Sequence, residues 1–249
     1  MIGGTSAGSM IASLYALGYT SNEIFELFKK YADELVKINK FTIVKEIKNF
    51  MTKKRIEASG LKTGEDLQKV YNKLAEERGI SEIKDIEMPL VIPSVDISTS
   101  KKINFCSKEM QKPNYINNIT VGEAIRASSA FPVIYSPFEY KEYLFLDGGI
   151  LENTPAKEVK NLGADKVISI KFDSDTVNKK SNAMDIVMKM IDIMGNKISE
   201  ESLKESDYII TIPSDGTGLL DKDKIDFCFK SGYETTRKQI EEIKQILRI

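Results

Sequence analysis

Histidine and tryptophan are absent from the 249-residue sequence, and cysteine is scarce, with only Cys106 and Cys228. Because zinc sites are built mainly from histidine and cysteine ligands, these absences argue against a zinc protein. The two cysteines are far apart and belong to no metal-binding or disulfide pattern, so we interpret both as buried thiols in a reducing compartment. Without histidine, no Ser-His-Asp catalytic triad can form.

An excess of charge of either sign is also missing, because 36 basic residues balance 37 acidic ones. A nucleic-acid-binding protein would favour a basic surface, so the sequence predicts no nucleic-acid partner. No apolar run approaches the roughly 20 residues that span a bilayer, and no signal-peptide pattern is found. We therefore expect a cytoplasmic protein, whose contact with a membrane would be peripheral.

Short apolar runs alternate with longer amphipathic ones, which is typical of an α/β fold. Thr20 and Glu23 form a capping-box pattern at the start of one helix. We predict helices over residues 6–18, 21–35, 63–79, 121–130, 154–163, 183–203 and about the last 25 residues, and strands over 88–98, 142–147, 165–172 and 207–213. We find no repeat or linker, so residues 1–249 are predicted to form a single domain.

Two amphipathic stretches each allow two interpretations. Between Lys37 and Arg55, seven basic residues accompany a single acid, Glu46. This pattern fits a helix on an anionic membrane surface or, more commonly, a helix on the core with a solvated lysine face. The methionine-rich residues 183–195 fit an adaptable binding surface or, more commonly, a buried helix.

The N-terminal sequence MIGGTSAGSM contains Gly-x-Ser-x-Gly, the pattern of a nucleophile elbow, in which a serine occupies a sharp turn between a strand and a helix. In that interpretation Ser6 projects its hydroxyl above the sheet. Gly4 and Gly8 would lack side chains where the strand and the helix approach most closely. The Ala7 N–H, at the helix start, would bind a developing oxyanion. A glycine-rich turn that simply opens a helix explains the same five residues equally well.

A serine hydroxyl needs a base to accept its proton, and without histidine the remaining bases are carboxylates and lysines. Asp147 has the most suitable local sequence, YLFLDGG, because it ends an apolar strand at a turn where Gly148 and Gly149 carry no side chains. Partial desolvation there would raise the pKa of its carboxyl and make it a better base. Taken alone, Asp-Gly is also a common turn signal.

Together, the GTSAG pattern and the distant DGG in a chain without histidine resemble the patatin-like phospholipase family. The blocks VDISTSKKINF, EAIRASSAFPVIYSPFEY, YLFLDGGILENTPAKEV and GLLDKDKIDFCFKSGYETT extend the resemblance along nearly the whole chain. The resemblance implies a three-layer α/β/α sandwich with a central, mostly parallel sheet, related to cytosolic phospholipase A2. It also implies that Ser6 is the nucleophile and Asp147 the base of a Ser–Asp dyad.

The first strand of the family, its glycine-rich oxyanion loop and its first helix have no counterpart before Ser6. We therefore expect an N-terminally truncated domain with an unpaired sheet edge beside the nucleophile, uncovered apolar surface and weakened oxyanion stabilisation. The in-frame DNA upstream of Met1 is expected to encode the loop roughly 30–45 residues before Ser6.

The resemblance implies a carboxylic-ester hydrolase of acyl lipids, of phospholipase A or lysophospholipase type, that acts through an acyl-enzyme. A lipid or another acyl ester would be its substrate. No cofactor or metal is expected, and no EF-hand-like acidic run offers calcium ligands. The absent oxyanion loop favours an alternative, a non-catalytic lipid-binding or regulatory protein on the same scaffold. The sequence leaves acyl-chain preference, head-group preference and oligomeric state open.

Overall fold

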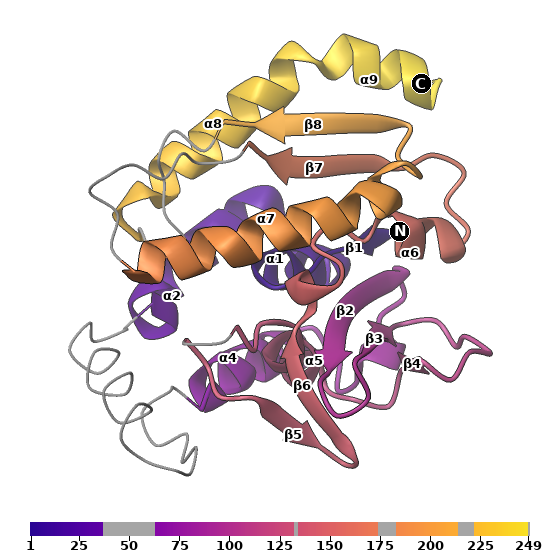
Figure 1. Ribbon diagram of the computed structural model, residues 1–249. Helices are drawn as coiled ribbons and strands as arrows, with labels where there is room; N and C mark the ends of the chain where they lie inside the picture. Colours follow the sequence, from indigo (N-terminus) through magenta and orange to yellow (C-terminus); the bar gives the residue numbers. More distant parts are fainter. Residues whose placement is uncertain (37–62, 132–133, 174–182, 214–221, 249) are drawn as a thin grey trace.

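The computed structural model describes residues 1–36, 63–131, 134–173, 183–213 and 222–248. Helices and strands alternate along these residues, which confirms the α/β class (Figure 1). The predicted amphipathic helix between Lys37 and Arg55 lies outside the described residues, so both of its interpretations stay open. Within the described residues, no helix combines the length and the apolar character that crossing a bilayer requires.

The elements follow the predicted order along the chain. The described strands are β1 (Ile2–Gly3), β2 (Leu90–Asp96), β3 (Lys101–Cys106), β4 (Tyr115–Ile116), β5 (Phe138–Tyr140), β6 (Tyr143–Asp147), β7 (Ile168–Phe172) and β8 (Tyr208–Ile212). The described α-helices are α1 (Ala7–Ala16), α2 (Ser21–Val36), α4 (Glu65–Glu76), α5 (Val121–Ser128), α6 (Ala156–Asn161), α7 (Ala183–Leu203), α8 (Ile225–Lys238) and α9 (Ile240–Leu247). The prediction of one terminal helix is wrong, because the helix is interrupted at Gln239, between α8 and α9.

The main sheet has six strands in the order β4-β3-β2-β6-β5, with β1 paired to β2. The β1–β2 and β3–β4 pairs are parallel, whereas β2–β3, β2–β6 and β5–β6 are antiparallel. This sheet is therefore mixed rather than mostly parallel as predicted. The physical reason is that residues 97–100 and 141–142 are short connections, and short connections can only join antiparallel neighbours. A parallel pair, β7–β8, forms a second sheet.

Helices cover both faces of the main sheet, which gives the predicted three layers. The residues of β2 alternate between two cores, as the period of a strand requires. Leu90 and Ile92 join the large core that includes α1, α4 and α5, whereas Val91 packs with Cys106 and Leu162 on the α6 side. In Figure 1, α8 and α9 lie along the β7–β8 sheet, where a third core forms around Ile210, Ile212 and Ile243.

Two sequence interpretations of buried side chains need correction. Cys106 is buried, but Cys228 is exposed on α8. The methionine-rich stretch does form a helix, α7, yet Met190 and Met194 are 56% and 60% exposed. These two side chains are therefore not core residues within the described part of the chain.

The predicted unpaired edge lies beside β1. Among the described strands, β1 pairs only with β2, and β7 pairs only with β8. Large apolar side chains on β7, Ile170 and Phe172, are 57% and 66% exposed. The turn that contains Ser6 thus follows a short strand with one edge unpaired by any described strand.

Candidate active site

Ser6 occupies the turn between β1 and α1 in a strained backbone conformation. Its φ of 53° and ψ of −123° are unusual for a residue with a side chain, and such outliers cluster at functional sites. A serine at this position normally caps the helix with its hydroxyl, but the Ser6 hydroxyl makes no capping hydrogen bond. Instead, Ser9 Oγ donates to Ser6 O at 2.6 Å. The Ser6 hydroxyl is therefore not committed to its own helix.

The two motif glycines have different roles in this turn. A Cβ on Gly4 would lie 2.2 Å from the carbonyl oxygen of Gly8, so the strand and helix backbones meet closely there, as predicted. A Cβ on Gly8 would meet nothing within 4 Å. The prediction that Gly8 also lacks a side chain for close packing is therefore wrong.

A buried serine that the sequence analysis missed holds the Ser6 backbone. The N–H of Ser6 donates to Ser128 Oγ at 3.0 Å, and the Ser128 hydroxyl donates to Pro93 O at 2.6 Å. Ser128 is fully buried on α5, so no water competes for either bond. One hydroxyl therefore ties the turn that contains Ser6 to α5 and to the central strand β2.

Replacing Ser128 by alanine is expected to lower the free energy of unfolding by about 1–3 kcal/mol, because the Ser6 N–H and the Pro93 carbonyl lose a buried partner. The neighbouring Ser129 is a matched control, since it is 3% exposed and its hydroxyl has no hydrogen-bond partner among the described residues. Ser129→Ala is expected to leave stability unchanged or to raise it. Urea unfolding of both variants tests the difference, and equal losses would contradict this role of Ser128.

Asp147 is the last residue of β6, opposite Ser94 of β2, and only 2% of it is exposed. Its Oδ1 accepts a hydrogen bond from the Gly149 N–H at 2.8 Å. Burial raises the pKa of the carboxyl to about 6, while contact with the Ser6 hydroxyl and the Gly149 N–H oppose this rise. Its Oδ2 is buried without a well-formed hydrogen bond from any described residue. Asp147 therefore has a free, desolvated oxygen and a serine hydroxyl nearby.

Close backbone contacts join the turn at residues 147–149, called the aspartate turn below, to the turn that contains Ser6, called the nucleophile turn because of its proposed role. A Cβ on Gly148 would lie 2.2 Å from Pro93 O, the same carbonyl that accepts from Ser128. The Thr5 hydroxyl, next to Ser6 in the chain, donates to Glu152 O at 2.8 Å. The fold thus brings Gly148 and its neighbours from β6 against the turn that follows β1.

Gly149 is also enclosed, because a helix closes over the aspartate turn. A Cβ on Gly149 would lie 3.0 Å from Asp147 Oδ1. From the other side, a Cβ on Gly195 of α7 would approach Gly149 O to 2.7 Å. The absence of a side chain at Gly195 therefore lets α7 pack directly on this turn.

The predicted oxyanion donor, Ala7, is exposed at the start of α1. The next two N–H groups, of Gly8 and Ser9, donate to Thr5 O and Ser6 O at 2.9 Å each. The first N–H groups of a helix have no acceptor within the helix, and they attract negative charge. The Ala7 N–H is next to Ser6 in the chain, and its role as oxyanion donor stays a prediction.

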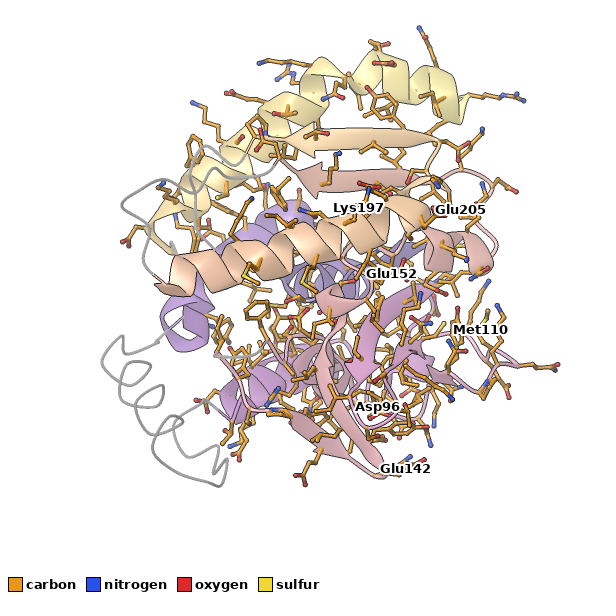
Figure 2. The ribbon with its side chains drawn as sticks, in the orientation of Figure 1. Asp96, Met110, Glu142, Glu152, Lys197 and Glu205 are labelled. Carbon is orange, nitrogen blue, oxygen red and sulfur yellow. The ribbon has the colours of Figure 1, made fainter. Side chains whose placement is uncertain are left out.

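Other candidate ligand sites lie elsewhere or are not formed by the described residues. A cavity of about 140 Å³ is lined by Lys108, Met110 and their neighbours but not by Ser6 or Asp147. In Figure 2, Met110 lies toward the edge of the molecule, whereas Glu152 of the aspartate segment lies beneath α7. Among the described residues, no group of three or more acidic, cysteine or histidine side chains could hold a metal ion.

The fold and the site define a class of α/β protein in which a serine on a strained strand–helix turn contacts a buried aspartate. The Patatin-like phospholipase family model matches residues 1–160, which is more than half of the chain. The chain belongs to the patatin-like phospholipase family.

Named relatives share this similarity at low sequence identity. Lysophospholipase NTE1 of Lodderomyces elongisporus is 24% identical over 261 residues, which cover 93% of this chain and 16% of the relative. The cGAMP-activated phospholipase of Vibrio cholerae is 26% identical over 159 residues, or 63% of this chain and 43% of the relative. VipD from Legionella pneumophila, a solved structure, has 16% identity and a TM-score of 0.38, covering 73% of this chain and 35% of that chain. This chain spans less than half the length of each.

Proposed function

We propose that the chain is a serine carboxylic-ester hydrolase of acyl lipids, of phospholipase A or lysophospholipase type, with Ser6 as nucleophile and Asp147 as base. The observation that carries the proposal is the burial of Asp147 beside Ser6, with a pKa raised to about 6. A carboxylate with such a pKa is ionised at neutral pH and accepts a proton more readily than an ordinary aspartate. The family and the names of its relatives support a lipid ester as substrate.

In the proposed reaction, Ser6 Oγ attacks the ester carbonyl carbon while Asp147 accepts the hydroxyl proton. The Ala7 N–H stabilises the oxyanion, and the C–O bond to the alcohol breaks as Asp147 returns the proton to the leaving oxygen. An acyl-enzyme remains on Ser6. Asp147 then accepts a proton from water, which attacks the acyl carbon, and the fatty acid leaves as Ser6 regains its proton. The steps need no metal or cofactor.

Exposed apolar side chains lie on the two helices that adjoin the turns of Ser6 and Asp147. Ile11 and Tyr15 on α1, the helix that begins next to Ser6, are 49% and 50% exposed. Met194 lies next to Gly195, the α7 residue that packs on the aspartate turn, and Ile198 is 42% exposed one turn later. We propose that this apolar surface of α1 and α7 contacts the acyl chain. Peripheral membrane contact and one domain over residues 1–249 stay predictions.

The alternative is a non-catalytic lipid-binding or regulatory protein on the same scaffold. It is favoured if oxyanion stabilisation rests on a single donor, and among the described residues Ala7 is the one N–H group that we assign to this task. Losing a single oxyanion donor lowers kcat by about 10²–10³-fold in other serine hydrolases. A stable scaffold with a weak or absent activity would fit that alternative.

A fluorophosphonate probe distinguishes the two functions, because it forms a covalent adduct only with an activated serine. We expect the folded chain to be labelled, with the adduct mapped by mass spectrometry to the peptide that contains Ser6. The heat-denatured chain is the control and should remain unlabelled. A chain that is folded by circular dichroism but takes up no probe would support the non-catalytic alternative, and an adduct on another serine would overturn the assignment of Ser6.

A further inference from the structure

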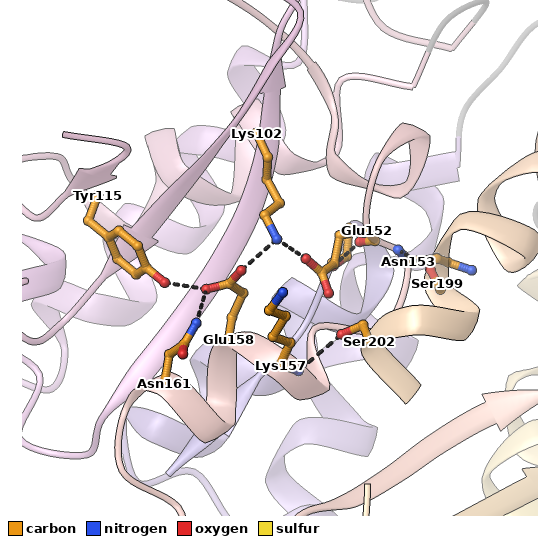
Figure 3. A network of polar contacts seen from close by, with 10 residues as sticks. Lys102, Tyr115, Glu152, Asn153, Lys157, Glu158, Asn161, Ser199 and Ser202 are labelled. Carbon is orange, nitrogen blue, oxygen red and sulfur yellow. Dashed lines mark hydrogen bonds and ion pairs between the residues drawn. The ribbon is translucent and has the colours of Figure 1, made fainter. Parts of the chain in front are cut away.

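A buried polar network fixes the segment that follows Asp147 to the main sheet (Figure 3). Lys102 of β3 lies at its centre and forms ion pairs with Glu152 and with Glu158 of α6. The side chains of Glu152 and Glu158 are only 4% and 6% exposed, and that of Lys102 is 24% exposed. Charged side chains are seldom buried so deeply unless they are paired. The burial of the two carboxylates therefore depends on their pairing with Lys102.

The two carboxylates depend on Lys102 to different degrees. Glu158 accepts further hydrogen bonds from the Tyr115 hydroxyl and from Asn161 Nδ2, the latter at 3.2 Å. Glu152 Oε2 accepts from Lys102, whereas Glu152 Oε1 is buried and has no partner among the described residues. Glu158 would thus remain bonded without Lys102, but Glu152 would lose the one side-chain donor that the structure describes for it.

The charges of the network do not balance, since two carboxylates share one ammonium group. Burial alone would lower the pKa of Lys102, but its hydrogen bonds to Glu152 and Glu158 raise the pKa above the ordinary value. Burial would likewise raise the pKa of Glu158, but the bonds from Lys102 and Tyr115 lower it. Lys102 is therefore firmly charged at neutral pH, and replacing either glutamate by a neutral residue would leave one cation facing one anion.

The main chain of Glu152 connects this network to both turns of the proposed site. Its N–H donates to Gly148 O at 2.8 Å, next to Asp147. Its carbonyl accepts the hydroxyl of Thr5, the neighbour of Ser6, at 2.8 Å. The residue thus bonds to the aspartate turn and to the nucleophile turn, while its side chain is held by Lys102.

Helix α7 anchors the same segment from the other side, as Figure 3 shows. Ser199 Oγ accepts the N–H of Asn153 at 2.8 Å, and Ser202 Oγ accepts the N–H of Lys157 at 3.0 Å. These bonds begin one residue after Glu152. They hold the chain that follows the turn. The turn itself is in contact with α7 through Gly195 and is hydrogen-bonded through Gly148 O to the Glu152 N–H.

We propose that Lys102 and Glu152 form a positioning pair. The ammonium of Lys102 holds Glu152 and thereby keeps the aspartate turn in its position against the Ser6 turn. The inference rests on the proposed function, because it assigns this pair to the alignment of Asp147 with Ser6. Neither side chain takes part in the chemical steps. Their effect on the reaction is geometric, and displacements of about 1 Å in such alignments cost enzymes about 100-fold in rate.

Two isosteric variants of the full chain distinguish a positioning role of Glu152 from the general effect of removing a negative charge beside Lys102. Glu152→Gln and Glu158→Gln each remove one negative charge beside the same lysine, and each leaves one ion pair behind. Glu152→Gln replaces the charge-assisted bond to Lys102 by a weaker neutral one and buries an amide N–H₂ where Oε1 has no partner among the described residues. We therefore expect Glu152→Gln to lower kcat for a soluble ester about tenfold with KM changed less than twofold. Glu158→Gln is expected to keep kcat within about twofold of the unchanged chain. Equal effects of the two variants, or a Glu152→Gln effect confined to KM, would overturn the proposal.

A second measurement does not depend on catalysis. Carboxyl ¹³C NMR follows the titration of Asp147, whose pKa burial raises to about 6. If Glu152→Gln loosens the turn, water reaches the carboxylate, and its pKa falls toward the ordinary value, whereas Glu158→Gln leaves it near that of the unchanged chain. A chain that hydrolyses no ester would refute the proposed function, and this titration would still decide the positioning role. If Asp147 has the same pKa in both variants, the positioning role of Glu152 is refuted.

Thr5→Val tests the same link from the opposite turn if Glu152→Gln does not fold. Valine matches threonine in shape but lacks the hydroxyl that bonds Glu152 O. The expected result is a fall in kcat similar to that of Glu152→Gln and the same downward shift of the Asp147 titration. If Thr5→Val folds and changes neither kcat nor the pKa of Asp147, Glu152 does not align the two turns.

Discussion

Asp147→Asn is expected to reduce ester hydrolysis about 10³-fold, because the variant keeps the shape of the side chain but removes the group that accepts the Ser6 proton. Asparagine can still accept the Gly149 N–H through Oδ1, so the turn should keep its conformation. The measurement is kcat for a soluble p-nitrophenyl ester at pH 8, together with the rate of fluorophosphonate labelling. A variant that retains full activity would show that another residue is the base.

The same substitution has a signature in stability that checks the burial of Asp147. Its pKa is about 6 in the folded chain and near 3.8 when exposed, so the folded state binds more protons between these values. The contribution of Asp147 to the free energy of unfolding therefore falls as pH rises from about 4 to about 6 and is constant above that range. Asp147→Asn removes this slope. At pH 8 we expect a stability within about 2 kcal/mol of the unchanged chain, because relief of the buried charge offsets a buried amide N–H₂ that lacks a partner.

Asp207→Asn is the matched control for both measurements. Asp207, at the start of β8, forms an ion pair with Lys166 that holds the pKa of its carboxyl at about 2. It therefore contributes stability above the unfolded pKa, and that contribution is lost as pH falls toward 2, which is the opposite sign. Activity should be unchanged, because Asp207 bonds to Val167 N and to lysines rather than to either turn of the site. A loss of activity equal to that of Asp147→Asn would show that the assay reports folding rather than proton transfer.

The dyad candidates could be found from sequence because each lies in a short local pattern. Gly-x-Ser-x-Gly and Asp-Gly-Gly place Ser6 and Asp147 at the ends of strands, and a chain without histidine leaves few other bases. Ser128 and Glu152 could not be found in this way. Their contacts join segments that are far apart in the chain, and a serine in an apolar helix or a glutamate after a turn is ordinary in composition. Only the folded chain shows which polar side chains meet.

The errors in the fold prediction have local causes. The mostly parallel sheet followed from family resemblance, although the connection at residues 97–100 is short enough to indicate an antiparallel hairpin. The pattern of α7 indicated a helix correctly, but hydrophobic spacing does not show whether an apolar face has a partner. The spacing of Met190 and Met194 is typical of a buried helix, yet both side chains are exposed.

The two glycines of the Gly-x-Ser-x-Gly motif differ in the space around them, so alanine is expected to act differently at each position. Gly4→Ala is expected to reduce fluorophosphonate labelling of Ser6 by about 100-fold or more, because its Cβ would lie 2.2 Å from Gly8 O and would push the strand away from the helix. The clash is with backbone, so no side chain can move aside. The free energy of unfolding should also fall by about 1–3 kcal/mol or more.

Gly8→Ala is the control within the same motif. Residue 8 lies in α1, its φ is not positive, and an added Cβ has open space around it. Alanine in a helix is favoured over glycine by up to about 1 kcal/mol, so this variant should be at least as stable as the unchanged chain. Urea unfolding of both variants checks the expectation. Equal destabilisation by the two alanines would mean that the second glycine is also needed for packing, as the sequence pattern alone suggests. The expected asymmetry would instead restrict the steric requirement to Gly4, where the backbone before Ser6 lies against the first turn of α1.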